Sequence, residues 1–83
     1  MMEDLILGAA TIWKGEVVLD CPVLEGLLAT HGKGAVTHGL ENLIENRHAR
    51  KAYAVAEALG LSNVAQYAAE VVKSAAARRT QTA

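Results

Sequence analysis

The feature that most constrains the fold is an alanine-rich run over residues 49–77, which is interrupted once by Leu59-Gly60-Leu61-Ser62. Alanine is the strongest helix former, glycine commonly ends a helix in a left-handed conformation, and serine caps the start of the next one. The run therefore predicts two helices joined by a tight corner at Gly60. Because alanine side chains are small, we expect the two helices to approach closely and form an antiparallel helical hairpin.

The composition predicts a thin hydrophobic core. Sixteen of the 83 residues are alanine, phenylalanine is absent, and Trp13 is the one tryptophan. A chain of this length is near the lower limit for folding alone, and the lone Cys21 can form no disulfide within the chain. We therefore expect one small domain over residues 1–79, a frayed tail at 80–83, and a homo-oligomer in which dimers are favoured.

The N-terminal residues and the single cysteine predict a cytoplasmic protein. Glu3 and Asp4 stand where a secretory signal would carry basic residues, and the apolar run Leu5–Trp13 is too short to span a bilayer. We expect no membrane contact. Small proteins of this kind are common among phage and mobile-element products, an origin with which the sequence is compatible.

Charge is divided between the two halves of the chain. Residues 1–46 carry two basic and seven acidic side chains, whereas residues 47–83 carry six basic and two acidic ones. This asymmetry can indicate an anionic partner for the second half. It can equally indicate that the two halves, or two subunits, face each other.

The first twenty residues predict a short β-hairpin. Apolar Leu5–Ile12 and β-branched Glu16–Leu19 are separated by Trp13-Lys14-Gly15, a glycine-containing connection of hairpin length. Leu5–Ala10 could instead begin a helix, because its alternation of apolar and polar residues is poor. A two-stranded hairpin is not stable alone, so it must pack on the helices or extend into a sheet with another copy.

Three helices are expected after the hairpin. Asp20 and the proline that follows it predict a helix over Pro22–His31, which Gly32 ends. The next helix is expected to run from about Ala35 to Leu59, either straight or bent at Gly39 or near Asn46, because neither glycine nor proline occurs between Gly39 and Gly60. The last begins at Ser62. The predicted fold is mainly α with an N-terminal β-hairpin, and its last two helices form the alanine-rich hairpin.

The segment Val55–Ser62 resembles the centre of a DNA-binding helix-turn-helix. That motif has a small residue four positions before the turn glycine, here Ala56 before Gly60, and an apolar residue after it, here Leu61. The resemblance implies that the helix after the corner would meet a partner with its polar first turns. The candidate partner-binding residues are Ser62, Asn63, Gln66, Tyr67, Arg78 and Arg79.

Two features depart from this motif. The second helix usually buries an aliphatic residue six positions after the glycine, and here that position holds Gln66, while Val64 lies two positions earlier. The preceding helix is also too long unless it breaks near Asn46. A structural helical hairpin with a glycine stop and a serine cap explains the same residues and is favoured over DNA binding.

Further residues were weighed as candidates for chemistry. His38, Glu41, Glu45 and His48 follow one another at steps of three, four and three residues, and Glu45-Asn46-Arg47-His48 matches a spacing used by di-iron bundles. This face lies opposite the apolar side of its helix, so we expect it to be a solvated face with no metal. No catalytic set and no cofactor site are expected.

A glycine-containing loop and a short strand gave two weaker alternatives. Thr30–Gly34 includes Lys33 but lacks the spacing of a nucleotide-binding loop. Glu16–Leu19 could pair across a two-fold axis in a ribbon-helix-helix dimer, but Glu16 and Asp20 would repel phosphates. The sequence therefore predicts a non-enzymatic protein-interaction module, a regulator, inhibitor or adaptor acting as a homo-oligomer. The alternative is a DNA-binding regulator that uses the segment around Gly60.

Overall fold

The computed structural model describes residues 2–82, and it describes the side chains of residues 2–76. The predicted residues Arg78 and Arg79, and the predicted tail at 80–83, lie outside the part whose side chains are described. The elements in chain order are α1 (Met2–Gly8), β1 (Ala10–Trp13), β2 (Glu16–Leu19), α2 (Cys21–Glu45), α3 (Ala49–Leu59) and α4 (Ser62–Thr82).

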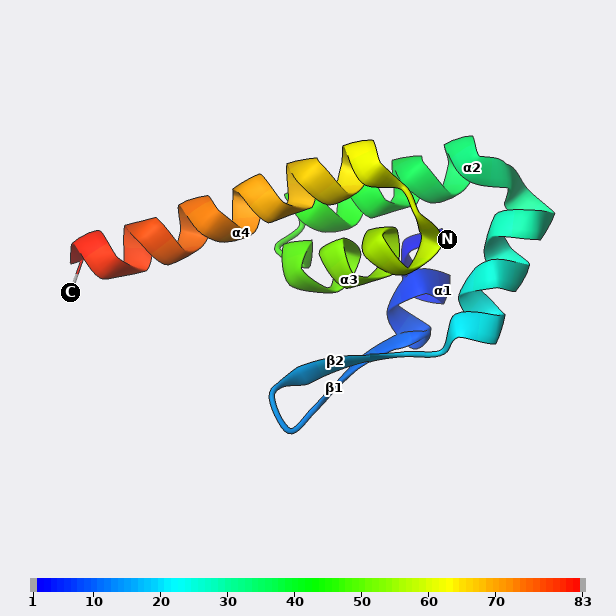
Figure 1. The fold of residues 1–83 in the computed structure, drawn as a ribbon, viewed down its shortest axis with the longest axis horizontal. Helices are drawn as coiled ribbons and strands as arrows, with labels where there is room; N and C mark the ends of the chain where they lie inside the picture. The colour runs from blue at the N-terminus through cyan, green and yellow to red at the C-terminus, as the bar shows by residue number, and fades with distance from the viewer. Residues whose placement is uncertain (1, 83) are drawn as a thin grey trace.

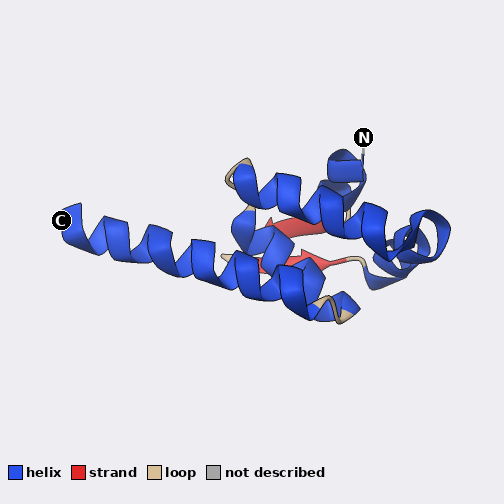
Figure 2. Ribbon diagram, turned by 90° about the horizontal axis from the view of Figure 1, so that it is seen from above, coloured by secondary structure: helices blue, strands red, loops and turns tan. Residues whose placement is uncertain are grey.

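Helix α3 occupies the centre of the fold. It packs against α4 and α2 on one side and against both strands of the hairpin on the other (Figures 1 and 2). The predicted class, mainly helical with an N-terminal β-hairpin, is confirmed. The number of helices was wrong, because the described residues form four helices instead of three.

The β-hairpin is antiparallel and closes through a two-residue turn. Ala10 pairs with Leu19 and Ile12 pairs with Val17, so these four residues share the face that packs towards α3. Lys14 and Gly15 form the turn with φ angles of 52° and 82°. Two positive φ angles give the turn a twist that matches the strands, which is why a two-residue connection suffices.

Helix α1 replaces the first part of the predicted strand. Its acidic first turn, with Glu3 and Asp4, suits the positive end of a helix, and Ile6 is fully buried. Asn42 of α2 donates a hydrogen bond from Nδ2 to Oε1 of Glu3 at 2.9 Å. A backbone hydrogen bond at Glu3, and then this bond from Asn42, lower the pKa of the Glu3 carboxyl.

Gly39 is the point where α1 approaches α2. A Cβ atom at Gly39 would lie 2.6 Å from Cγ of Met2 and 3.3 Å from Cδ1 of Ile6. Gly39 is therefore needed for close approach of the two helices, and the helix does not bend there. The kink in α2 falls at Gly32, with φ 87° and ψ 161°, where the sequence predicted a helix end.

The predicted continuous helix from Ala35 to Leu59 was wrong, because α2 ends at Glu45 and α3 begins at Ala49. The backbone N–H of His48 donates to the carbonyl of Leu43 at 2.8 Å, and that of Arg47 donates to the carbonyl of Ile44 at 3.4 Å. Arg47 adopts a left-handed conformation with φ 71°. These bonds satisfy the last carbonyls of α2 and reverse the chain.

Helix α3 ends with the same pair of hydrogen bonds. Leu61 N–H donates to the carbonyl of Ala56 at 2.9 Å, and Gly60 N–H donates to that of Glu57 at 3.3 Å. Gly60 has φ 71°, as the sequence predicted for a glycine stop. Helices α3 and α4 then run side by side in opposite directions, so the expected alanine-rich hairpin forms (Figure 1).

The core is rich in alanine, as its composition predicted. No polar or charged side chain is buried within the described part of the chain. None of the helices in residues 2–82 has the length and hydropathy that a membrane span needs. The buried apolar residues are Ile6, Ala9, Ala10, Leu24, Val36, Leu40, Leu43, Ile44, Ala49, Ala52, Val55, Ala56, Leu61, Val64, Ala65 and Ala68.

The close approach at Gly39 gives a testable prediction. We expect Gly39→Ala to lower the free energy of unfolding by about 1–3 kcal/mol, because the new methyl overlaps Met2. The matched control is Gly26→Ala, where a Cβ meets nothing within 4 Å and helix propensity rises by up to about 1 kcal/mol. Urea denaturation followed by circular dichroism measures both. Equal stability of the two variants would contradict the close packing of α1 on α2.

Candidate interaction surfaces

The polar start of α4 is exposed, as its candidate role requires. Ser62, Asn63 and Gln66 are exposed, and Tyr67 is 38% exposed. The side chains that α4 buries instead are Val64, Ala65 and Ala68. Because Gln66 points away from the core, α4 packs in a different register from the second helix of a helix-turn-helix. The packing therefore supports a structural hairpin at this corner.

One departure from the helix-turn-helix pattern is removed by the structure. The stop at Asn46–His48 shortens the helix before the corner to the 11 residues of α3. A motif helix of ordinary length therefore precedes Gly60. This observation keeps DNA binding as a second candidate function.

The structure brings Lys33 to the corner. Lys33 and Thr37 of α2 line a hollow of about 100 Å³ together with Ser62 and Asn63 at the start of α4. The hollow thus joins a residue of the glycine-containing loop to two of the predicted partner-binding residues. Its small volume accommodates a few water molecules at most.

The predicted histidine and carboxylate face does not form one helix face throughout. His38, Glu41 and Glu45 lie exposed on α2, as expected for a solvated face, whereas His48 lies beyond the end of α2 and directly before α3. Across the described residues, no three His, Cys, Asp or Glu side chains gather where they could hold a metal ion. Cys21 lies exposed at the first position of α2.

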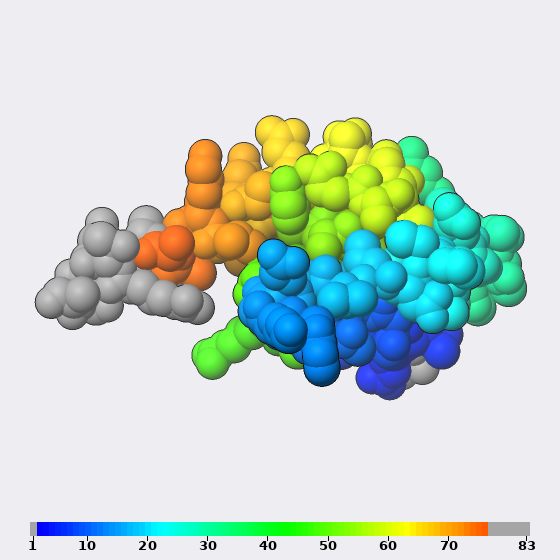
Figure 3. Space-filling view, turned by 60° about the horizontal axis from the view of Figure 1, so that its bottom comes forward, coloured from blue at the N-terminus to red at the C-terminus, as the bar shows by residue number. Residues whose placement is uncertain are grey.

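A second and wider hollow lies where α4 leaves the body of the molecule. Helix α4 has 21 residues and α3 has 11, so α4 is about 15 Å longer at about 1.5 Å per residue. An open groove of about 720 Å³ lies beneath this extension, and we call it the α4 groove. Figure 3 shows the orange part of α4 standing off the body. The groove is lined by Ile44, Glu45, Arg47, Ala49, Arg50, Val71, Val72, Ala75 and Ala76.

The apolar side of the α4 groove continues the stripe that α4 buries on α3. Successive helical residues turn by about 100°, so Val72 and Ala75 fall on the same half of α4 as Val64 and Ala68. Val64 and Ala68 are buried by the neighbouring helices, whereas Val72 is 38% exposed. The apolar stripe of α4 therefore extends beyond the part that the neighbouring helices cover.

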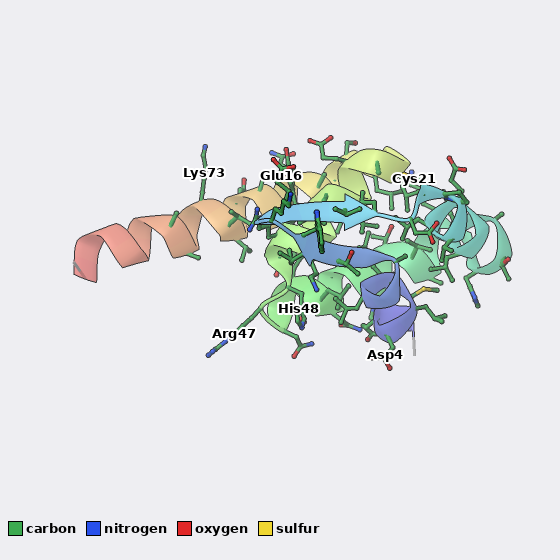
Figure 4. The ribbon with its side chains drawn as sticks, turned by 90° about the horizontal axis from the view of Figure 1, so that it is seen from below. Asp4, Glu16, Cys21, Arg47, His48 and Lys73 are labelled. Carbon is green, nitrogen blue, oxygen red and sulfur yellow. The ribbon has the colours of Figure 1, made fainter. Side chains whose placement is uncertain are left out.

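Arg47 stands at the rim of the α4 groove in a strained backbone conformation. A non-glycine residue in the left-handed region costs about 1–2 kcal/mol. Gly60, at the equivalent helix stop, has the same φ of 71° and avoids this cost. The Arg47 side chain extends outward on the side from which α4 projects (Figure 4). Backbone strain of this kind often accompanies a functional role for the side chain.

The hairpin tip carries an exposed aromatic side chain next to a lysine. Trp13 is 67% exposed, and Nζ of Lys14 lies 5.9 Å from the centre of its ring. Arg50 of α3 donates a hydrogen bond to the carbonyl of Gly15 and so attaches the tip to the body. Arg50 also lines the α4 groove. The tip and the groove are therefore neighbouring surfaces.

Exposed apolar side chains concentrate near the hairpin. Trp13 and Val18 lie on the sheet face opposite α3, and Leu5 of α1 and Val23 of α2 are exposed on the elements that flank the hairpin. Figure 3 shows these three elements side by side on one surface. This surface is a second apolar area on the outside of the molecule.

Sequence reasoning missed the α4 groove although part of its signal was present. Val64, Ala68, Val71, Val72 and Ala75 share one side of a helix by their spacing alone. The groove follows only when α3 is known to begin at Ala49. The prediction of a continuous helix from Ala35 to Leu59 did not include this start at Ala49.

Comparisons with known proteins identify no relative: no family model, no curated protein and no solved structure matches the chain.

The strain at Arg47 is testable. We expect Arg47→Gly to raise the free energy of unfolding by up to about 1 kcal/mol, since relief of the left-handed cost exceeds the added entropy of the unfolded glycine. The control, Gly60→Ala, introduces the same strain and should lower stability by a similar amount. Thermal and urea denaturation at low protein concentration measure both. Loss of stability in Arg47→Gly would show that the side chain itself stabilises the folded chain.

Proposed function

We propose that the protein is a small non-enzymatic interaction module, a regulator, inhibitor or adaptor, that works in the cytoplasm as a homo-oligomer, with a dimer favoured. The observation that carries this proposal is the apolar stripe of α4, which extends past α3 and leaves Val72 exposed over an open groove. Full burial of a valine side chain stabilises by about 1.5–3 kcal/mol. Val72 is 38% exposed, so a partner in the groove would supply the remaining part of that burial.

The length of the α4 extension supports the same proposal. Isolated helices shorter than about 12–15 residues are marginal in water, because their stability in proteins comes mainly from packing of an apolar face. The extension of α4 continues a helix that is already nucleated, but Val72 on its apolar face stays 38% exposed and so lacks part of this packing. Packing against a partner therefore provides what the extension lacks in a single copy.

The hairpin surface offers a place for a different protein. Trp13 is the most exposed of the large apolar side chains. Lys14 lies beside its ring, and Arg50 binds the neighbouring Gly15 carbonyl. Tryptophan and arginine are enriched at the energetic centres of protein interfaces. We expect the matching segment to present a carboxylate next to an apolar side chain.

Self-association can be measured directly on the unmodified chain. We expect sedimentation velocity to show an increase in weight-average mass from monomer towards dimer between about 1 µM and about 1 mM, the range of weak to moderate dissociation constants. Addition of salt should weaken the association only modestly, since the proposed contact is mainly apolar and screening acts on the charges at its rim. A monomer throughout this range would exclude the homo-oligomer.

DNA binding through the corner is the second candidate function. The specific observation in its favour is the helix stop at Asn46–His48, which gives α3 a length typical of the motif. The exposed side chains of Ser62, Asn63, Gln66 and Tyr67 would then meet the nucleic acid. Two features count against DNA binding. The first half of the chain is acidic, and α4 packs so that Gln66 is exposed where a helix-turn-helix would bury an aliphatic residue.

A gel shift with genomic fragments tests this second function. If the corner reads DNA, the double variant Asn63→Ala, Gln66→Ala should weaken binding by about tenfold or more, because each base contact contributes about 1–3 kcal/mol. The control is Glu57→Ala on α3, which removes an exposed carboxylate that hydrogen-bonds Tyr53 at 2.7 Å. Absence of any shift with the wild-type protein excludes the corner as a DNA reader.

A further inference from the structure

We infer that the α4 groove is filled by the α4 extension of a second copy of this chain, related by a two-fold axis that passes near Ala75. This inference rests on the proposed function and specifies the surface that the homo-oligomer uses. Each copy then contributes one groove and one helix extension. A single symmetric contact then covers the exposed apolar side of the α4 groove on each copy.

The shape of the groove fits a helix with small side chains. Its α4 wall is formed by two valines and two alanines, and Ala49 lies on the opposite side. Small residues let two helix backbones approach closely, as Gly39 shows for α1 and α2 within this fold. The α4 extension presents the same small side chains outward, so a copy of it is a suitable occupant.

The charges at the groove also favour a second copy. The rim carries the carboxylate of Glu45 and the guanidinium groups of Arg47 and Arg50. A two-fold interface brings the same patch together with itself, so it must contain both signs of charge to be self-complementary. A nucleic acid would be attracted by the two arginines but repelled by Glu45. The mixed rim therefore fits this chain better than a polyanion.

Arg47 gives an independent reason to place an interface here. Its left-handed backbone costs stability that glycine would not, and its side chain lies at the groove rim. In the dimer, we place its guanidinium against Glu45 of the second copy. The strained backbone thus directs the arginine away from its own body and across the two-fold axis.

The size of the groove sets the expected affinity. Nine residues line it, whereas a standard protein interface uses about 20–30 residues on each side. We therefore expect a weak dimer, with a dissociation constant in the micromolar range or above. The fraction of the protein that is dimeric then changes over ordinary laboratory concentrations.

The first test replaces a groove valine by a charged residue. We expect Val72→Glu to weaken dimerisation about a hundredfold, because the symmetric contact contains the substitution twice. The matched control is Val23→Glu, since Val23 is similarly exposed at 46% but lies at the start of α2 on the hairpin side. Sedimentation equilibrium measures both, and circular dichroism confirms that both remain folded.

The second test locates the contact by cross-linking and does not depend on a destabilising charge. In a Cys21→Ser background, Ala75→Cys should form a cross-linked dimer with a short bis-maleimide. Ser74→Cys, which is turned by about 100° around the same helix and lies off the groove side, should cross-link at least tenfold less. Positions 74 and 75 are adjacent in α4, so the two cysteine variants should have comparable stability.

The outcomes separate this inference from the proposed function. A wild-type monomer at every concentration overturns both. A wild-type dimer that persists in Val72→Glu, with equal cross-linking at positions 74 and 75, overturns the groove contact and leaves the homo-oligomer. A dimer lost in Val23→Glu but kept in Val72→Glu moves the interface to the hairpin surface. Loss in Val72→Glu with selective cross-linking at Ala75→Cys supports the inference.

Discussion

The hydrogen bond from His48 N–H to the carbonyl of Leu43 is the interaction on which the rest of this fold depends. With Arg47 in the left-handed region, it ends α2 and returns the chain along α2 as α3. A straight continuation would leave the hairpin and α4 without the helix on which both pack. The centre of the molecule is thus created by one reversal, and the alanine side chains of α3 let the other elements surround it closely.

The parts of the fold that the sequence predicted are those marked by glycine. The hairpin turn, the kink in α2 and the corner before α4 each contain a glycine with positive φ, at Gly15, Gly32 and Gly60. The stop after α2 uses the same hydrogen bonds as the corner but has arginine at the left-handed position, so the sequence indicated a bend near Asn46 and not a helix end. A helix in Leu5–Ala10 was kept only as an alternative to a strand, because α1 packs against Gly39, a residue 31 positions beyond its last residue Gly8.

The candidate surface could be predicted only in part for the same reason. The apolar spacing on α4 and the polar exposure of Ser62–Tyr67 are local properties, and the structure shows both. A groove is a relation between two elements, and it depends on where the shorter one begins. If the predicted start of α3 is wrong by a few residues, the apolar stripe of α4 is expected to be covered where the structure leaves it exposed. The thin alanine core, by contrast, follows from composition and needed no knowledge of topology.

Arg50 belongs to two surfaces at once, because it holds the hairpin tip through the Gly15 carbonyl and also lines the α4 groove. An occupant of the groove that recruits this guanidinium must withdraw it from the tip and free Trp13 and Lys14 to move. By thermodynamic linkage, a ligand that alters the tip then changes the affinity of the groove by the same factor as the groove changes the affinity of the tip. One side chain therefore couples the conformation of the hairpin tip to the α4 groove.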